Sequence, residues 1–200
     1  MNYPKRKYPR LKQYDYSLPG YYYVTIHNER NAPLLSSIEP GDGLCRASVT
    51  LTRVGTIVMK QLMLLEQRYP YVEIDKYAIM PNHVHVIIRL RDGGMPRPGL
   101  TAIVGAYKSL ATREINMARN TPGQKQFQRS FYETVIRSET AYQSCWLYID
   151  GNPEKWGKQE EHDWDFCVMD EKGPGKLQQC NDRKAAVGAS PHPTERGREK

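Results

Sequence analysis

Two histidines separated by one valine lie in the apolar run IMPNHVHVIIRL, residues 79–90. The alternation of the run and its Val and Ile content predict a β-strand that follows a Pro-Asn turn. Side chains alternate across a strand, so His83 and His85 share one face with Ile87 and Arg89. Two imidazoles on one face can hold a divalent metal ion and leave coordination positions open for a substrate. A pair of exposed or hydrogen-bonded sheet histidines is the alternative interpretation.

The rest of the sequence offers no further cluster of histidines. Position 87 is Ile, and His27, His162 and His192 are scattered, so we expect these three to be structural or solvated. The missing metal ligand is therefore expected from Asn, Gln, Asp or Glu. None of the cysteines forms a C-x-x-C pair, which argues against a zinc ribbon. We expect free thiols at all four of them: Cys45, Cys145, Cys167 and Cys180.

The segment SETAYQSCWLYIDGNP predicts a helix at about Glu139–Gly151. Tyr148 lies off its apolar stripe, and Asn152, four residues on, falls on the same side. One helix edge can therefore present a phenol and an amide to the sheet. Because Asn152 precedes Pro153, we expect it at the very end of the helix, and a plain stop signal is the alternative interpretation of Asn-Pro. The apolar stripe consists of Tyr142, Cys145, Trp146 and Ile149.

The elements that must position these residues are read from hydrophobic periodicity. Their order, β-α-β-β-α-β, is the ferredoxin-like split βαβ arrangement, an α+β fold with an antiparallel sheet. Right-handed crossovers place both helices on one face, which leaves the histidine face open for the added C-terminal helix. Val84, Val86, Ile88 and Leu90 should then face the two helices. The predicted elements are strands at 20–29, 71–80, 83–90 and 125–138, a loop at 31–45, and helices at about 51–69 and 100–118.

Length and composition indicate one folded domain with additional chain at both ends. The chain has 200 residues, 39% of them hydrophobic and 26% charged, and no apolar run approaches the ~20 residues of a membrane span. The charged N-terminus has no apolar segment typical of a signal peptide, so we expect a cytoplasmic protein. We divide the chain into a basic, tyrosine-rich arm (1–19), a domain (20–169) and a tail (170–200). The tail is rich in charge, Gly and Pro, and we expect it to be disordered.

The net charge of +7 favours phosphate-bearing partners. In the arm, four tyrosines alternate with cations, and rings that stack on bases beside cations that hold phosphates suit single-stranded nucleic acid. The alternative is an arm that packs on its own domain through amphipathic tyrosines. The residues concerned are Tyr3, Tyr8, Tyr14 and Tyr16, with Lys5, Arg6, Lys7, Arg10 and Lys12.

Four blocks in order, MPNHVHVII, AYKSLATREIN, FQRSFYETVIRSE and YIDGNP, resemble those of a known family. The chain is similar to the REP-associated tyrosine transposases, a branch of the single-tyrosine HUH (His-hydrophobe-His) transposases, over about Tyr3 to Phe166. The later segment HDWDFCV is similar to the family's Trp-Pro-Phe-Ser segment and departs from it at Asp165 and Cys167.

The resemblance implies a transposase and nickase acting on single-stranded, hairpin-bearing DNA. His83 and His85 would ligate Mg²⁺ or Mn²⁺, with Asn152 as a third ligand or polar support. Tyr148 would attack the scissile phosphate, forming a 5′-phosphotyrosine that allows rejoining without ATP. Tyr132 is the rival nucleophile and is assigned to sheet packing or DNA contact. Expected DNA-binding residues are Arg6, Lys7, Arg10, Lys108, Arg129 and Arg137.

Two other functions fit the same residues. A domesticated relative could bind structured DNA or RNA without cutting it, and a metal-dependent hydrolase could use water in place of the tyrosine. Retention of both histidines with Tyr148 and Asn152 favours the transposase, since a pure binder needs no such set. Both a monomer and a homodimer are compatible with the sequence.

Overall fold

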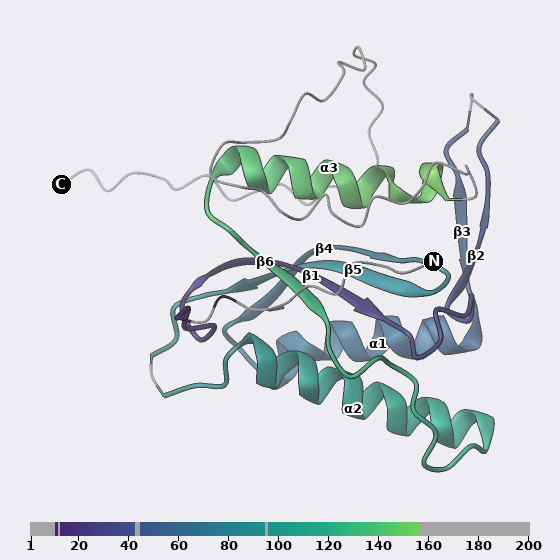
Figure 1. The fold of residues 1–200 in the computed structure, drawn as a ribbon, viewed down its shortest axis with the longest axis horizontal. Helices are drawn as coiled ribbons and strands as arrows, with labels where there is room; N and C mark the ends of the chain where they lie inside the picture. The colour runs from purple at the N-terminus through teal and green to yellow at the C-terminus, as the bar shows by residue number, and fades with distance from the viewer. Residues whose placement is uncertain (1–10, 12, 43–44, 95, 157–200) are drawn as a thin grey trace.

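A four-stranded antiparallel sheet lies between two layers of helices (Figure 1). The computed structural model describes residues 11, 13–42, 45–94 and 96–156. In space the strands run in the order β4-β5-β1-β6. Their bounds are Gly20–His27 for β1, Val72–Ile79 for β4, His83–Leu90 for β5 and Tyr132–Ile136 for β6.

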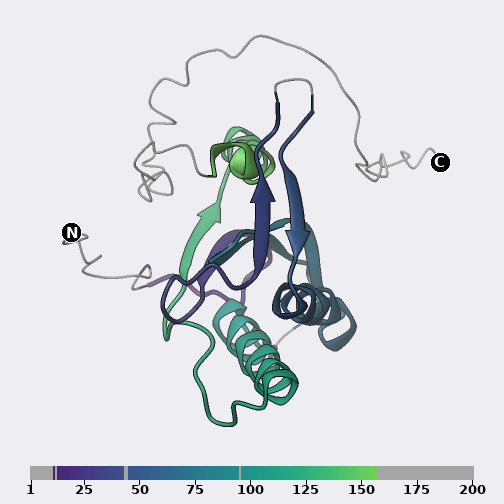
Figure 2. The same ribbon diagram turned by 90° about the vertical axis from the view of Figure 1, so that its right-hand side faces the viewer.

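Helices α1 (Arg53–Arg68) and α2 (Leu100–Arg119) lie together on one face of the sheet, and α3 (Glu139–Lys155) lies over the other (Figures 1 and 2). The predicted α+β fold, a ferredoxin-like β-α-β-β-α-β order with an added C-terminal helix, is confirmed.

Apolar alternation in the strands builds the main core between the sheet and the helices α1 and α2. In β5 the even-numbered residues are fully buried there, as predicted: Val84, Val86, Ile88 and Leu90. Helix α1 contributes Val58, Leu62 and Leu65 from one stripe. It begins at the N-cap Thr52, whose side-chain oxygen accepts a hydrogen bond from the Gly55 amide, and its C-cap is Tyr69, before Pro70.

The predicted loop at 31–45 is in part wrong, because an additional hairpin lies between β1 and α1. Its strands are β2 (Ser36–Glu39) and β3 (Ser48–Leu51), so Leu51 ends a strand where the sequence predicted a helix. The strand sequences SSIE and SVTL are short and polar, and they lack the apolar alternation by which strands are recognised. The hairpin extends from the level of α1 to that of α3 (Figures 1 and 2).

The second face of the sheet is covered by α3 through a small apolar cluster. The predicted stripe on α3 is confirmed, since Cys145 and Ile149 are buried and Tyr142 and Trp146 pack beside them. The buried residues of this cluster are Tyr23, Ile87, Ile136, Cys145 and Ile149.

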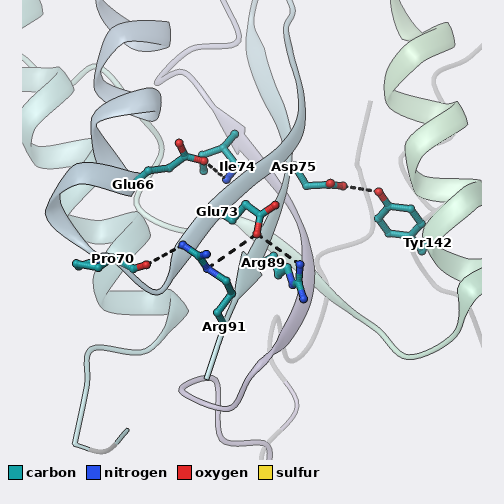
Figure 3. Close-up of polar contacts among 8 residues, drawn as sticks. All are labelled: Glu66, Pro70, Glu73, Ile74, Asp75, Arg89, Arg91 and Tyr142. Carbon is teal, nitrogen blue, oxygen red and sulfur yellow. Dashed lines mark hydrogen bonds and ion pairs between the residues drawn. The ribbon is translucent and has the colours of Figure 1, made fainter. Parts of the chain in front are cut away.

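Polar contacts to β4 and to the hairpin also hold α3 in place. The Tyr142 hydroxyl donates to an Asp75 carboxylate oxygen at 2.7 Å, bridging α3 and β4 (Figure 3). Nearer the C-terminus of α3, Asp150 pairs with Lys76 of β4 and with Arg46 of the hairpin, both at 2.6 Å. The orientation of α3 is therefore fixed from two sides.

The prediction that the third helix ends at Asn152 is wrong, since α3 continues through Pro153 to Lys155. A proline in a helix removes one backbone donor and disfavours the preceding α conformation. Two contacts offset this cost. The Ala47 amide donates to the Glu154 carboxylate at 2.5 Å, and the Trp156 amide donates to the Pro153 carbonyl at 3.2 Å.

Both described tyrosines of the arm pack on the domain, which was the alternative interpretation of its composition. The Tyr16 hydroxyl donates to Glu133 at 3.2 Å, and the Tyr14 and Tyr22 hydroxyls lie 3.4 Å apart. Tyr3, Tyr8 and the cations at 5–7, 10 and 12 lie outside the described residues, as do Cys167, Cys180 and the tail. Within the described part of the chain, no helix has the length and apolar character to cross a membrane.

Candidate active site

His83 and His85 meet on the α3 face of the sheet. Both side chains are almost fully buried, and their Nε2 atoms lie 2.8 Å apart. Alternation along β5 explains the shared face, and Val84 between them points into the main core.

Each imidazole is held by an oxygen atom at its other ring nitrogen. Nδ1 of His83 lies 2.6 Å from the Asn82 amide oxygen, which can only accept, so this nitrogen donates. Nδ1 of His85 lies 2.7 Å from the Tyr23 hydroxyl and 3.0 Å from the Thr25 hydroxyl. Oxygen partners at Nδ1 are typical of metal-binding histidines, because they orient the ring and leave Nε2 for the metal.

Burial favours the neutral form of the imidazoles of His85 and His27. It lowers the pKa of His85 to about 3, and the neighbouring His27 adds to the effect. Burial also lowers the pKa of His27 below its usual value. A neutral imidazole is the form that binds a metal ion, and His85 is held in this form at neutral pH.

His27, which the sequence predicted to be structural or solvated, is buried directly beside the histidine pair. The β1–β5 register pairs it directly with His83, and the two rings lie 5.3 Å apart. It is 6% exposed. The pairing of β1 with β5 brings His27 next to His83, although more than fifty residues separate them in the sequence. The signal that could have found His27 is the antiparallel pairing of the first strand with the His-x-His strand.

Side chains of α3 and of its C-cap residue pack against the two histidines. The Tyr148 ring lies 5.4 Å from the ring of His85, and the Trp156 ring lies 6.2 Å from that of His83. Asn152, four residues after Tyr148, lies on the same side of α3, and it is 5% exposed. The structure thus brings together His83, His85 and Tyr148, and it buries Asn152 on the same helix as Tyr148. Trp156 was missed; it is the C-cap of α3, four residues beyond the position at which the helix was expected to end.

One cation lies close to the phenol of Tyr148. The Lys155 ammonium is 5.6 Å from the centre of this ring, and the Tyr23 ring packs against it edge-on at 6.2 Å. A positive charge at this distance favours negative charge that develops on the phenol oxygen.

The rival tyrosine, Tyr132, is on the edge strand β6. Its ring lies 6.0 Å from the ring of His27, and Thr25 of β1 separates it from His85 in the sheet register. Tyr148 is in direct ring contact with His85. Of the two tyrosines, Tyr148 is therefore the one in contact with the histidine pair.

Lys108 has a structural role that the sequence did not reveal. Its ammonium donates to the carbonyl oxygens of Gln128, Arg129 and Ser130, which fixes the segment before β6. Helix α2 also lies on the sheet face away from the histidines (Figure 1). Arg129 and Arg137 are exposed, and their contact with phosphates stays a prediction.

A divalent cation fits the groups that converge at the histidine pair. Two ligands at right angles around Mg²⁺ lie about 3 Å apart, close to the separation of the two Nε2 atoms. Among the described residues there is no cluster of three His, Cys, Asp or Glu side chains that could hold a metal ion. The predicted binding of Mg²⁺ or Mn²⁺ by His83, His85 and the Asn152 amide therefore stays a prediction.

Comparison with solved structures relates this geometry to a known protein. A REP-associated tyrosine transposase bound to a REP hairpin superposes with a TM-score of 0.54 at 20% identity, covering 74% of this chain and 75% of that one. The chain has the fold of this REP-associated tyrosine transposase. A proposed transposase of Deinococcus radiodurans aligns over 71% of the chain and 95% of its own, at 16% identity and a TM-score of 0.44.

Comparison of sequences says less about function than comparison of structures. An uncharacterized protein of Haemophilus influenzae is 29% identical over 167 residues, covering 76% of this chain and 89% of its own length. No family model matches the sequence.

Proposed function

We propose that the protein is a REP-associated tyrosine transposase that cuts and rejoins single-stranded, hairpin-bearing DNA. The observation that carries the proposal is the position of Tyr148, whose ring lies 5.4 Å from His85 while the Nε2 atoms of His83 and His85 converge at 2.8 Å. A nucleophile and a candidate metal site therefore meet on one sheet face. The fold shared with a transposase that binds a REP hairpin supports the same partner for this chain.

Strand transfer in this proposal needs one covalent step and its reversal. The phenol oxygen of Tyr148 attacks the scissile phosphorus, a new O–P bond forms, and the bond from phosphorus to the 3′ oxygen breaks. The phenol proton passes to solvent, and the departing oxygen takes up a proton to become a 3′-hydroxyl. The 5′-phosphotyrosine keeps the phosphodiester bond energy, so the reverse attack by a 3′-hydroxyl rejoins DNA.

The surrounding residues support this step. His83, His85 and Asn152 would hold a divalent cation, which supplies Lewis-acid polarisation of the phosphate. Free tyrosine has a pKa of about 10, so attack at neutral pH needs a neighbour that favours the phenolate. Lys155, with its ammonium 5.6 Å from the Tyr148 ring, is placed to do so.

A covalent adduct between protein and DNA is the decisive test. Labelled, hairpin-bearing single-stranded DNA is incubated with the full chain and Mn²⁺, and the products are separated on a denaturing gel. We expect a slowly migrating protein–DNA band that disappears in Tyr148→Phe and His83→Ala. Tyr132→Phe, which removes the rival phenol and keeps the ring, should still form the adduct.

Other outcomes identify the two alternative functions. Cleavage without a covalent band would indicate a hydrolase that uses water. DNA binding without cleavage over several hairpin sequences would indicate a binding module. A readout independent of activity tests the metal site: Mn²⁺ should raise the thermal midpoint of the wild type and leave that of His83→Ala unchanged.

A further inference from the structure

Tyr132 faces the site from the edge of the sheet. The register pairs Tyr132 with Thr25, and Thr25 with His85, so the three side chains lie in one row on the α3 face. Strands are spaced about 4.8 Å apart, so β6 lies about 10 Å from β5. Tyr132 is thus too far from the histidine pair to be part of it, but it lies next to the pair on the same face of the sheet.

Tyr132 is the exposed end of an otherwise buried row of rings. The row consists of His85, His83, His27 and Tyr132, in that order. The distance between ring centres is 4.4 Å from His85 to His83, 5.3 Å from His83 to His27 and 6.0 Å from His27 to Tyr132. The three histidines are 2–6% exposed, whereas Tyr132 is 47% exposed. A polymer that reaches the histidines from this edge must pass this ring.

The backbone that carries the Tyr132 ring is held in place by contacts of the preceding residues. Phe131, the preceding residue, is 5% exposed and packs in the main core. The Lys108 ammonium holds the carbonyl oxygens of residues 128–130. The Gln128 amide also donates to the His27 carbonyl at 3.0 Å. A ring held in this way loses little conformational freedom when a ligand stacks on it.

The charges nearby suit a nucleic acid. Arg129, three residues before Tyr132, is exposed, and Arg30 is exposed on the segment that pairs with 126–128. An exposed ring beside cations is the arrangement that binds single strands, with bases on the ring and phosphates on the cations. Two strand spacings place the ring about one or two nucleotides from a phosphate at the histidine pair.

We infer that Tyr132 is a stacking platform for a base that flanks the scissile phosphate of single-stranded DNA. This inference rests on the proposed function, since it takes the histidine pair as the phosphate site. The hydroxyl of Tyr132 has no part in it, so Phe should replace Tyr without loss. The ring positions the strand, and Tyr148 carries out the chemistry.

Fluorescence of a base analogue tests the contact in a protein that cannot cut. The full chain with Tyr148→Phe is titrated onto a DNA hairpin with a single-stranded flank, in which 2-aminopurine replaces each flank base in turn. Stacking should quench the analogue at one or two adjacent positions. Adding Tyr132→Leu should remove the quenching and weaken binding about 10-fold, while Tyr132→Phe should keep both.

Matched controls separate this inference from the proposed function. Tyr77, 37% exposed on the opposite edge strand β4, is the control: Tyr77→Leu should leave quenching and affinity unchanged. Tyr132→Thr, which suits a strand, replaces Tyr132→Leu if the latter does not fold. Quenching and affinity that survive both substitutions overturn the inference and leave the proposed function intact. Failure of the protein with intact Tyr132 to bind any hairpin DNA overturns both.

Discussion

The hydroxyl oxygen of Tyr23 lies 2.7 Å from Nδ1 of His85, the ring nitrogen opposite the one that faces His83. Thr25 reaches the same nitrogen at 3.0 Å. Two hydroxyls from β1 therefore set the orientation of an imidazole on β5. A hydroxyl can donate or accept, so this pair can serve either tautomer of His85.

Removing the Tyr23 hydroxyl should weaken metal binding without unfolding the protein. Tyr23→Phe keeps the ring in the apolar cluster beneath α3 and should lower Mn²⁺ affinity about 10-fold, measured by calorimetry. Adding Thr25→Val should lower it further, because His85 then has neither hydroxyl. Tyr71→Phe, which removes a hydroxyl bonded to the Pro98 carbonyl, is the control and should not change the affinity. Equal affinities in all variants would show that the two hydroxyls do not orient the ring.

Substitution of Asn152 should separate metal binding from stability. Asn152 is 5% exposed, and a carboxylate in its place is costly to bury alone and a better ligand for a divalent cation. Asn152→Asp should therefore lower the thermal midpoint of the metal-free protein and enlarge the increase that Mn²⁺ produces. Asn152→Leu should reduce that increase. The idea fails if Mn²⁺ shifts the midpoint equally in both variants.

The Lys155 charge should matter for chemistry more than for folding. Its ammonium lies 5.6 Å from the Tyr148 ring, and Lys155→Met should slow single-turnover adduct formation about threefold or more. The rise of the rate with pH should move to higher pH, since the phenolate becomes harder to form without the nearby charge. Lys155→Arg, which keeps the charge, should recover most of the rate. A uniform loss with no change in the pH profile would point to a role in DNA binding alone.

The Asp150 ion pairs should make stability depend on acid pH. Burial works against the shift, but bonds from Lys76 and Arg46 hold the pKa of the Asp150 carboxyl below its usual value. The stabilisation is therefore present above the unfolded pKa of about 3.8 and is lost as the pH falls through the lower folded pKa. Asp150→Asn should cost about 1 kcal/mol at pH 6 by urea unfolding, and the difference should shrink as the pH falls below 3.8. A difference that is constant with pH would exclude the charge as its cause.

Gly55 should not tolerate a side chain, although it is part of a helix. Gly→Ala usually stabilises an exposed helix by up to about 1 kcal/mol. A Cβ atom at Gly55, however, would lie 1.9 Å from the Leu35 carbonyl oxygen. Gly55→Ala should therefore cost about 1–3 kcal/mol by urea unfolding. Gly105→Ala in α2, where a Cβ meets no atom within 4 Å, should be neutral or stabilising.

The periodicity of hydrophobic residues in the sequence was sufficient to predict the main sheet and the two helices that pack on it. The 3.6-residue and two-residue patterns placed both main helices and the four strands of the sheet, because each buries one face in a large core. The hairpin was missed because its strands are half-exposed and polar. Asn152 was placed at a helix end because the rule for residues before proline is local, whereas Glu154 is held by the hairpin amide of Ala47.

The candidate site was predictable only in part. Two histidines two residues apart show their shared face directly in the sequence, as do Tyr148 and Asn152 on one helix edge. The contributions of His27, Tyr23 and Thr25 depend on the β1–β5 register, which no local pattern specifies. The structural role of Lys108 depends on three carbonyl oxygens that only the folded chain brings together.

The apolar cluster under α3 is small, and its size affects the order in which parts of the protein unfold. Local opening costs least where few apolar side chains are buried, so α3 should detach from the sheet before the main core melts. Its amide hydrogens should then exchange with solvent sooner than those of α1 and α2. Tyr148 leaves the histidines in the same event. Mild heat should therefore inactivate the protein while its sheet is still intact.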